Sequence, residues 1–274
     1  MSQSVRRSAY IFLCAFPFVG VGFVSVRPLR IAGIFQTLGV FLFIAVAIAA
    51  WLSGPRKVDL KGEGRWKQAL AGLVLIAPSA IISLLWVGLG PPFQATTSEN
   101  YMRFLVLVWN SILVTIGFVL TRDVLNDAGE RVCSAIGLAT ALIAGAAYLI
   151  CLNLSLAQTA LALHGNRTQP PAIIVDFYSA IEFVACVMTY VTTAAFATAM
   201  GRVRLLGRTA AGAYVTVAAV LGLLIIVRGL AYPEISANTA PWYTRPGVIA
   251  GIPAIPWLMP YLLGAVLLRR TRAD

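Results

Sequence analysis

"AIIVDFYSAIEFVACVMTY", residues 172–190, belongs to an apolar run long enough to cross a bilayer, yet it carries two carboxylates, Asp176 and Glu182. About 20 apolar residues in a helix span the hydrocarbon layer with every backbone group bonded inside the helix. Apolar runs of this length recur along the chain, so each of them is expected to form a membrane-spanning helix as well.

The composition agrees with a membrane protein. Of 274 residues, 59% are apolar and 11% charged, whereas soluble domains have about 25% charged residues. We therefore expect an all-α, polytopic integral membrane helix bundle, a single transmembrane domain over residues 1–274 without a soluble domain. The eight expected transmembrane helices lie at about 8–26, 31–52, 69–89, 103–121, 132–153, 173–200, 210–231 and 247–268.

The first span leaves an alternative open. It contains Pro17 and follows Arg6 and Arg7, as a secretory signal would, so seven spans would remain if it were cleaved or re-entrant. The one small-x-small candidate for a cleavage site, Gly20-Val21-Gly22, matches the A-x-A pattern poorly, which favours eight spans.

The distribution of positive charge predicts the orientation. The net charge is +11, and most of the 21 Lys and Arg residues fall on one side of the expected membrane. The positive-inside rule places that side, with both termini, in the cytoplasm. The six remaining cations are Arg27, Arg30, Arg103, Arg167, Arg228 and Arg245. This pattern accounts for the positive charge without a nucleic-acid partner, and we expect a cell membrane of the bacterial inner-membrane type.

Missing residues exclude several cofactors. The chain has one histidine, His164, so neither a bis-histidine haem nor a zinc site of several imidazoles is available. No lysine lies in an expected span, and no phosphate-binding G-x-x-x-x-G-K-[ST] motif is present. The four cysteines form no C-x-x-C pair and are interpreted as packing residues. We expect no cofactor and no bound metal.

The sixth span has a polar stripe. The residues Ser179, Glu182, Cys186, Thr189 and Thr193 follow one another at spacings of 3, 4, 3 and 4, so they share one face of a helix. Such a face is directed at other helices or at a wet cavity and not at lipid.

Depth separates the two acids of this span. At about 1.5 Å per residue, Glu182 lies ~9 Å further along the helix than Asp176. Asp176 can be solvated at the headgroup level. A charge near the membrane centre costs at least ~2.5 kcal/mol, so Glu182 is either protonated or stabilised by neighbours.

Other polar residues are expected at a similar depth. They are Arg228 on the seventh span, Arg103 and Asn110 on one face of the fourth, and Tyr148 on the fifth. The eighth span contains three prolines that remove backbone donors and are expected to kink the helix: Pro253, Pro256 and Pro260. Together with Glu182 and Asp176, the four polar residues form the candidate binding site.

Two structural interpretations follow. Glu182 and Arg228 either hold two helices together as an ion pair, or they border a polar cavity open to the outer face that binds a small solute or lipid headgroup. A small-solute or lipid transporter is favoured slightly, because a polar, kinked half lowers the stability of a passive scaffold. A membrane-embedded sensor or an accessory subunit with a membrane protein partner is the alternative. An intramembrane lipid-modifying enzyme comes third, since no nucleophile has a partner at a defined spacing.

Overall fold

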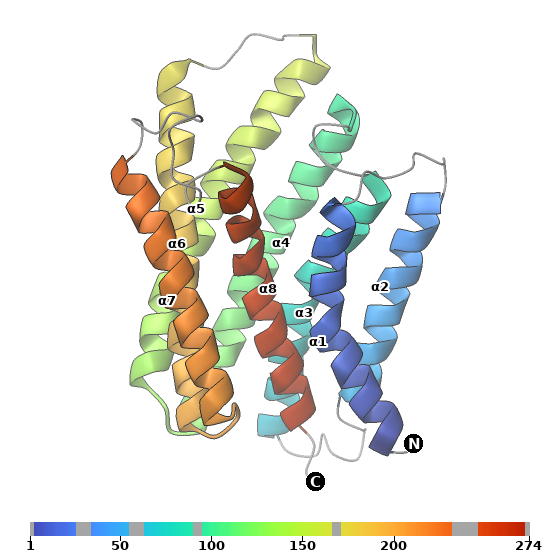
Figure 1. The fold of residues 1–274 in the computed structure, drawn as a ribbon, viewed down its shortest axis with the longest axis vertical. Coiled ribbons are helices and arrows are strands. Elements are labelled where there is room, and N and C mark those ends of the chain that lie inside the picture. The colour runs from blue at the N-terminus through green and yellow to red at the C-terminus, as the bar shows by residue number, and fades with distance from the viewer. Residues whose placement is uncertain are drawn as a thin grey trace.

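The computed structural model describes residues 3–25, 34–54, 63–89, 95–165, 171–231 and 246–271. Within these ranges the chain is helical and has no strand. Each of the eight expected spans falls on one helix. The helices are α1 Gln3–Ser25, α2 Ile34–Ser53, α3 Glu63–Leu89, α4 Thr97–Asp127, α5 Val132–Leu163, α6 Ala172–Arg202, α7 Arg208–Ala231 and α8 Pro246–Arg270 (Figure 1).

Four of the helices identify the chain as a membrane protein. In the described part of the chain, α4, α5, α6 and residues 208–227 of α7 are long and apolar enough to cross a bilayer. The first three have 31, 32 and 31 residues, about 10 more than the hydrocarbon layer requires. Their ends therefore extend beyond it, which explains why they outrun the spans expected from hydropathy.

Local sequence sets the ends of these helices. Thr96 caps α4, where its hydroxyl accepts a hydrogen bond from the Glu99 N–H and the Glu99 side chain accepts one from the Thr96 N–H. At the C-terminal end of α5, His164 is the C-cap, and Gly165 follows it with a φ of +82°. The single histidine of the chain therefore lies where the fifth helix ends.

Consecutive helices from α1 to α7 pack side by side, and α8 returns against α3 between the two halves of the bundle (Figure 1). The crossing of α3 and α8 depends on two glycines. A Cβ on Gly72 would lie 2.8 Å from the carbonyl oxygen of Gly264, and a Cβ on Gly264 would lie 2.8 Å from that of Gly72. Small residues of this kind let membrane helices approach closely.

The first helix is part of the packed bundle. Leu13 and Phe16 of α1 are buried in a cluster that includes Tyr261 of α8. A second cluster joins α4 and α6 through the stacked rings of Phe118 and Phe196, whose centroids are 4.9 Å apart. Both chain termini lie at the same end of the bundle, which we call the termini end (Figure 1).

Candidate functional site

The polar stripe of α6 turns inward, as its spacing predicts. Cys186, Thr189 and Thr193 are buried, whereas Asp176, in the second turn of the helix, is exposed. Thr189 and Thr193 each donate to the carbonyl four residues earlier, at 2.8 and 2.9 Å. Hydroxyls bonded to their own helix can be placed inside a membrane, because none of their donors is left unsatisfied.

Side chains of α5 meet this stripe. The Tyr148 hydroxyl lies 3.7 Å from the Cys186 sulfur, and the Cys151 thiol donates to the Tyr178 carbonyl at 3.8 Å. About two turns further towards the termini end, the Thr192 hydroxyl donates to that of Thr140 at 2.9 Å.

Glu182 lies on the same surface of α6. It is half-buried and ten residues into the helix, or about 15 Å from the first residue of α6. Its carboxylate acts electrostatically on Tyr148 and Cys151 of α5 and on Tyr178 and Cys186 of α6. The structure therefore brings together two of the residues expected at the site, Glu182 and Tyr148.

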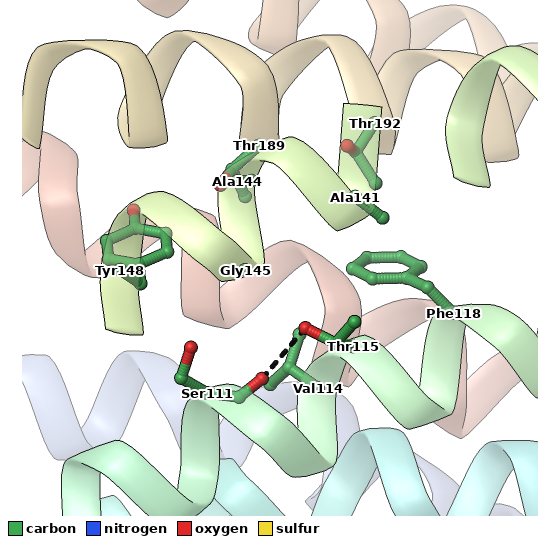
Figure 2. A pocket seen from close by; sticks show the side chains of 10 residues that line it. All are labelled: Ser111, Val114, Thr115, Phe118, Ala141, Ala144, Gly145, Tyr148, Thr189 and Thr192. Atoms are coloured by element: carbon green, nitrogen blue, oxygen red, sulfur yellow. Dashed lines mark hydrogen bonds between the residues drawn. The ribbon is translucent and has the colours of Figure 1, made fainter. Parts of the chain in front are cut away.

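A cavity of about 20 Å³ adjoins these groups between α4, α5 and α6. In Figure 2, α4 forms one wall, and α5 and α6 form the other. The lining residues are Ser111, Val114, Thr115, Phe118, Ala141, Ala144, Gly145, Tyr148, Thr189 and Thr192. A cavity of this size holds about one water molecule.

The hydroxyls around the cavity offer mainly acceptors. Thr115 donates to the Ser111 carbonyl at 3.0 Å, and Thr189 donates to the Ala185 carbonyl at 2.8 Å. The single proton of the Thr192 hydroxyl is shared between the Met188 carbonyl, at 2.8 Å, and the Thr140 hydroxyl, at 2.9 Å. A hydroxyl that has donated its proton retains oxygen lone pairs. Because Glu182 adds a carboxylate nearby, the site suits a ligand that donates hydrogen bonds or carries positive charge.

We call this set of side chains the polar seam. Its members come from three neighbouring helices and are Ser111 and Thr115 of α4, Tyr148 and Cys151 of α5, and Glu182, Cys186, Thr189 and Thr192 of α6. The α4 members, Cys151 and Thr192 were not among the site residues expected from the sequence. The close approach of α4 and α5, where Thr115 packs on Gly145, brings the α4 hydroxyls to the seam.

Two expected site residues of α4 are placed differently. Asn110 is buried and directed at α3, where its side-chain amide donates to the Pro78 carbonyl at 3.4 Å. Arg103 is also buried, and its Nη1 donates to the Asn100 side chain at 2.6 Å. Since residues seven apart share a helix face, both belong to the α3-facing surface of α4, whereas Thr115 faces α5.

The remaining expected residues are described only in part. Arg228 lies in α7, and Pro253 and Pro256 lie in α8, but their side chains are outside the described part of the chain. Pro260 is buried. The α8 helix continues through all three prolines without interruption, and the expected kink stays a prediction.

A second group of polar contacts lies at the termini end. Glu130 precedes α5 and is buried, and its carboxylate accepts hydrogen bonds from the N–H groups of Cys133 and Ser134 at 3.0 and 2.9 Å. It also lies 3.5 Å from the Arg202 guanidinium. Burial raises the pKa of the Glu130 carboxyl, but these donors and Arg202 outweigh it, so the pKa is below its ordinary value.

No group of three or more His, Cys, Asp or Glu residues that could hold a metal occurs in the described ranges. The sequence matches no protein-family model, and no match is found among curated proteins or among solved structures.

Proposed function

We propose that this chain is an eight-span membrane protein that transports a small solute or lipid, with the polar seam as part of the path. The observation that carries the proposal is Glu182, a half-buried carboxylate on an apolar helix that acts electrostatically on Tyr148, and Tyr148 lines a cavity together with several hydroxyls. Ionisable residues inside membrane helices are expensive and mark substrate and ion pathways. A scaffold would be more stable without one.

The chemistry of the seam narrows the substrate class. Its hydroxyls present oxygen lone pairs, and Glu182 presents either a negative charge or an exchangeable proton. A cationic or hydrogen-bond-donating solute would pair with the ionised carboxylate. Alternatively, Glu182 would take up a proton as the solute moves, which couples transport to pH.

In this proposal the structure corresponds to a closed state of the transporter. The cavity has room for about one water molecule, so a larger solute passes only when α4 separates from α5 and α6. In that interface Thr115 packs directly on Gly145, where no side chain separates the two helices. We also propose that both termini lie in the cytoplasm, as the positive-inside rule predicts.

The test is a flux assay. The purified chain is reconstituted in liposomes that enclose a pH-sensitive dye, and amines, amino acids, polyols, sugars and carboxylates are added in turn. We expect one class to drive a proton flux in the wild type. Glu182→Gln should lower that flux about tenfold or more, as loss of a required proton carrier does.

The matched control is Asp127→Asn, which makes the same change of carboxylate to amide at the exposed end of α4 and should keep the flux. The proposal fails if the folded wild type moves no class of solute, or if Glu182→Gln retains full flux. Stoichiometric copurification with another membrane protein, without flux, would support the accessory subunit instead.

A further inference from the structure

Five exposed arginines gather at the termini end, around the turns that join α4 to α5 and α6 to α7. We call them the arginine cluster, and they are Arg131, Arg202, Arg204, Arg208 and Arg270. Contacts across helices hold the cluster together. The Arg270 Nε donates to the Leu205 carbonyl at 3.1 Å, which ties the end of α8 to the α6–α7 turn. Through the contact of Arg202 with Glu130, the cluster reaches the start of α5.

The positive charge of the cluster is only slightly neutralised. Among the residues that the structure describes, Glu130 is the carboxylate that contacts it, and both oxygens of Glu130 already accept hydrogen bonds from the start of α5. Lys67, at the same end of the bundle, differs because it lies 3.2 and 3.3 Å from two aspartates, Asp123 and Asp127. The cluster therefore has guanidinium donors left for an external anion.

Arg204 has a strained backbone. Its φ is +60°, and it follows the end of α6 in a turn where Leu206 N–H donates to the Met200 carbonyl at 3.1 Å. Glycine is the usual residue at this left-handed position after a helix, because a Cβ is disfavoured there. Strained residues of this kind persist where their side chain has a role, and here the side chain adds a guanidinium to the cluster.

We propose that the arginine cluster is a binding site for the phosphate headgroup of an anionic phospholipid. One guanidinium group can donate two parallel hydrogen bonds to two oxygens of a phosphate, whereas a lysine ammonium group cannot. The cluster lies at the ends of helices that cross the bilayer, where headgroups are found, and basic groups there are attracted to anionic lipid. This site is separate from the polar seam and does not depend on transport.

The experiment measures lipid binding by the full chain in a neutral detergent. Native mass spectrometry gives the affinity for phosphatidylglycerol, and melting followed by tryptophan fluorescence gives the stability. Arg204→Gly removes a cation and the backbone strain together, so it should fold as well as the wild type and melt at the same or a higher temperature. Its affinity for phosphatidylglycerol should fall about fivefold. The double variant, Arg204→Gly combined with Arg270→Gln, should bind phosphatidylglycerol about 25-fold more weakly than the wild type.

The control is Arg65→Gln, which removes an exposed cation from the start of α3 at the same end of the bundle. Its affinity should stay within about twofold, since it lies outside the cluster. The proposal is overturned if Arg65→Gln weakens binding as much as Arg204→Gly, because the attraction would then be a general field. The proposal would also be overturned if the wild type bound phosphatidylcholine as tightly as phosphatidylglycerol. A third contrary outcome is a melting temperature raised by inorganic phosphate in a protein that binds no phosphatidylglycerol.

Discussion

The termini end and the polar seam satisfy their polar groups in different ways. At the termini end, carboxylates meet cations: Glu130 lies 3.5 Å from Arg202, and Lys67 lies 3.2 Å from Asp123. In the seam, hydroxyls bond to carbonyls of their own helix, as Thr189 does at 2.8 Å, and thiols meet a phenol or a carbonyl.

Solvation explains the difference. Near water, a partly exposed pair such as Lys67 with Asp123 loses little solvation and contributes little to stability. Glu130 is buried, and two N–H groups together with Arg202 stabilise its charge. Inside the bilayer a charge is expensive, so neutral groups that satisfy themselves locally are preferred. Glu182 departs from this pattern because it places an ionisable carboxyl group on an apolar helix. Arg103, which is buried in α4 and bonded to the Asn100 side chain, is a second charged side chain of this kind.

The largest effect in this comparison is expected for Glu130→Ala. The change removes the acceptor for two N–H groups at the start of α5 and the partner of Arg202. Loss of a helix cap costs about 2 kcal/mol at the upper end of its range, which a buried site approaches. Unfolding of the purified protein, followed by tryptophan fluorescence, measures the loss.

Glu99→Ala is the matched control, since Glu99 caps the start of α4 but is only half-buried. Glu99→Ala should lower the free energy of unfolding by less than half as much as Glu130→Ala. If the two variants lose the same free energy, burial does not make the Glu130 contacts stronger.

The contribution of Glu130 should also depend on pH in a defined direction. Its pKa in the folded state is below the ordinary value, because the Ser134 and Cys133 N–H groups and Arg202 outweigh its burial. A lowered pKa gives a stability contribution that is present above the ordinary value and is lost as the pH falls through the folded-state pKa. The difference in melting temperature between wild type and Glu130→Ala should be constant from neutral pH to about pH 5 and then shrink. A difference that grows in acid would contradict this assignment.

A smaller effect is expected for Thr192→Val in the seam. This change removes the hydroxyl that bonds Thr140 across α5 and α6 at 2.9 Å. Hydrogen bonds between membrane helices average about 0.6 kcal/mol, so the loss should be of that order. Thr198→Val is the control, because the Thr198 hydroxyl donates to Ala194 of its own helix at 2.8 Å. If both variants lose the same stability, the contact between helices adds nothing.

The sequence predicted the helices and the inward face of α6. Apolar runs of about 20 residues locate membrane helices without knowledge of their neighbours, and a 3-4 spacing fixes which side chains share a face. Both are local properties. The burial of Cys186, Thr189 and Thr193 agrees with the spacing.

The sequence did not predict which helices would share the seam. Asn110 was expected beside Glu182, but it donates to Pro78 of α3, while Ser111, one residue later, lines the cavity. A rotation of about 100° per residue separates them, and only the packing of α4 decides which one faces α5. The same holds for Gly72 and Gly264, because nothing local marks them among 23 glycines.

The smallest effect is expected for Lys67→Gln at the termini end. Hydrogen bonds to Asp123 and Asp127 raise the pKa of the Lys67 ammonium, so the group stays charged at neutral pH. The three side chains are between 31% and 47% exposed, and ion pairs that water reaches are screened by salt. We expect Lys67→Gln to lower the melting temperature slightly at low ionic strength and not at all at high salt. A loss that persists at high salt, equal to that of Glu130→Ala, would mean that Lys67 and its two aspartates are shielded from solvent as Glu130 is.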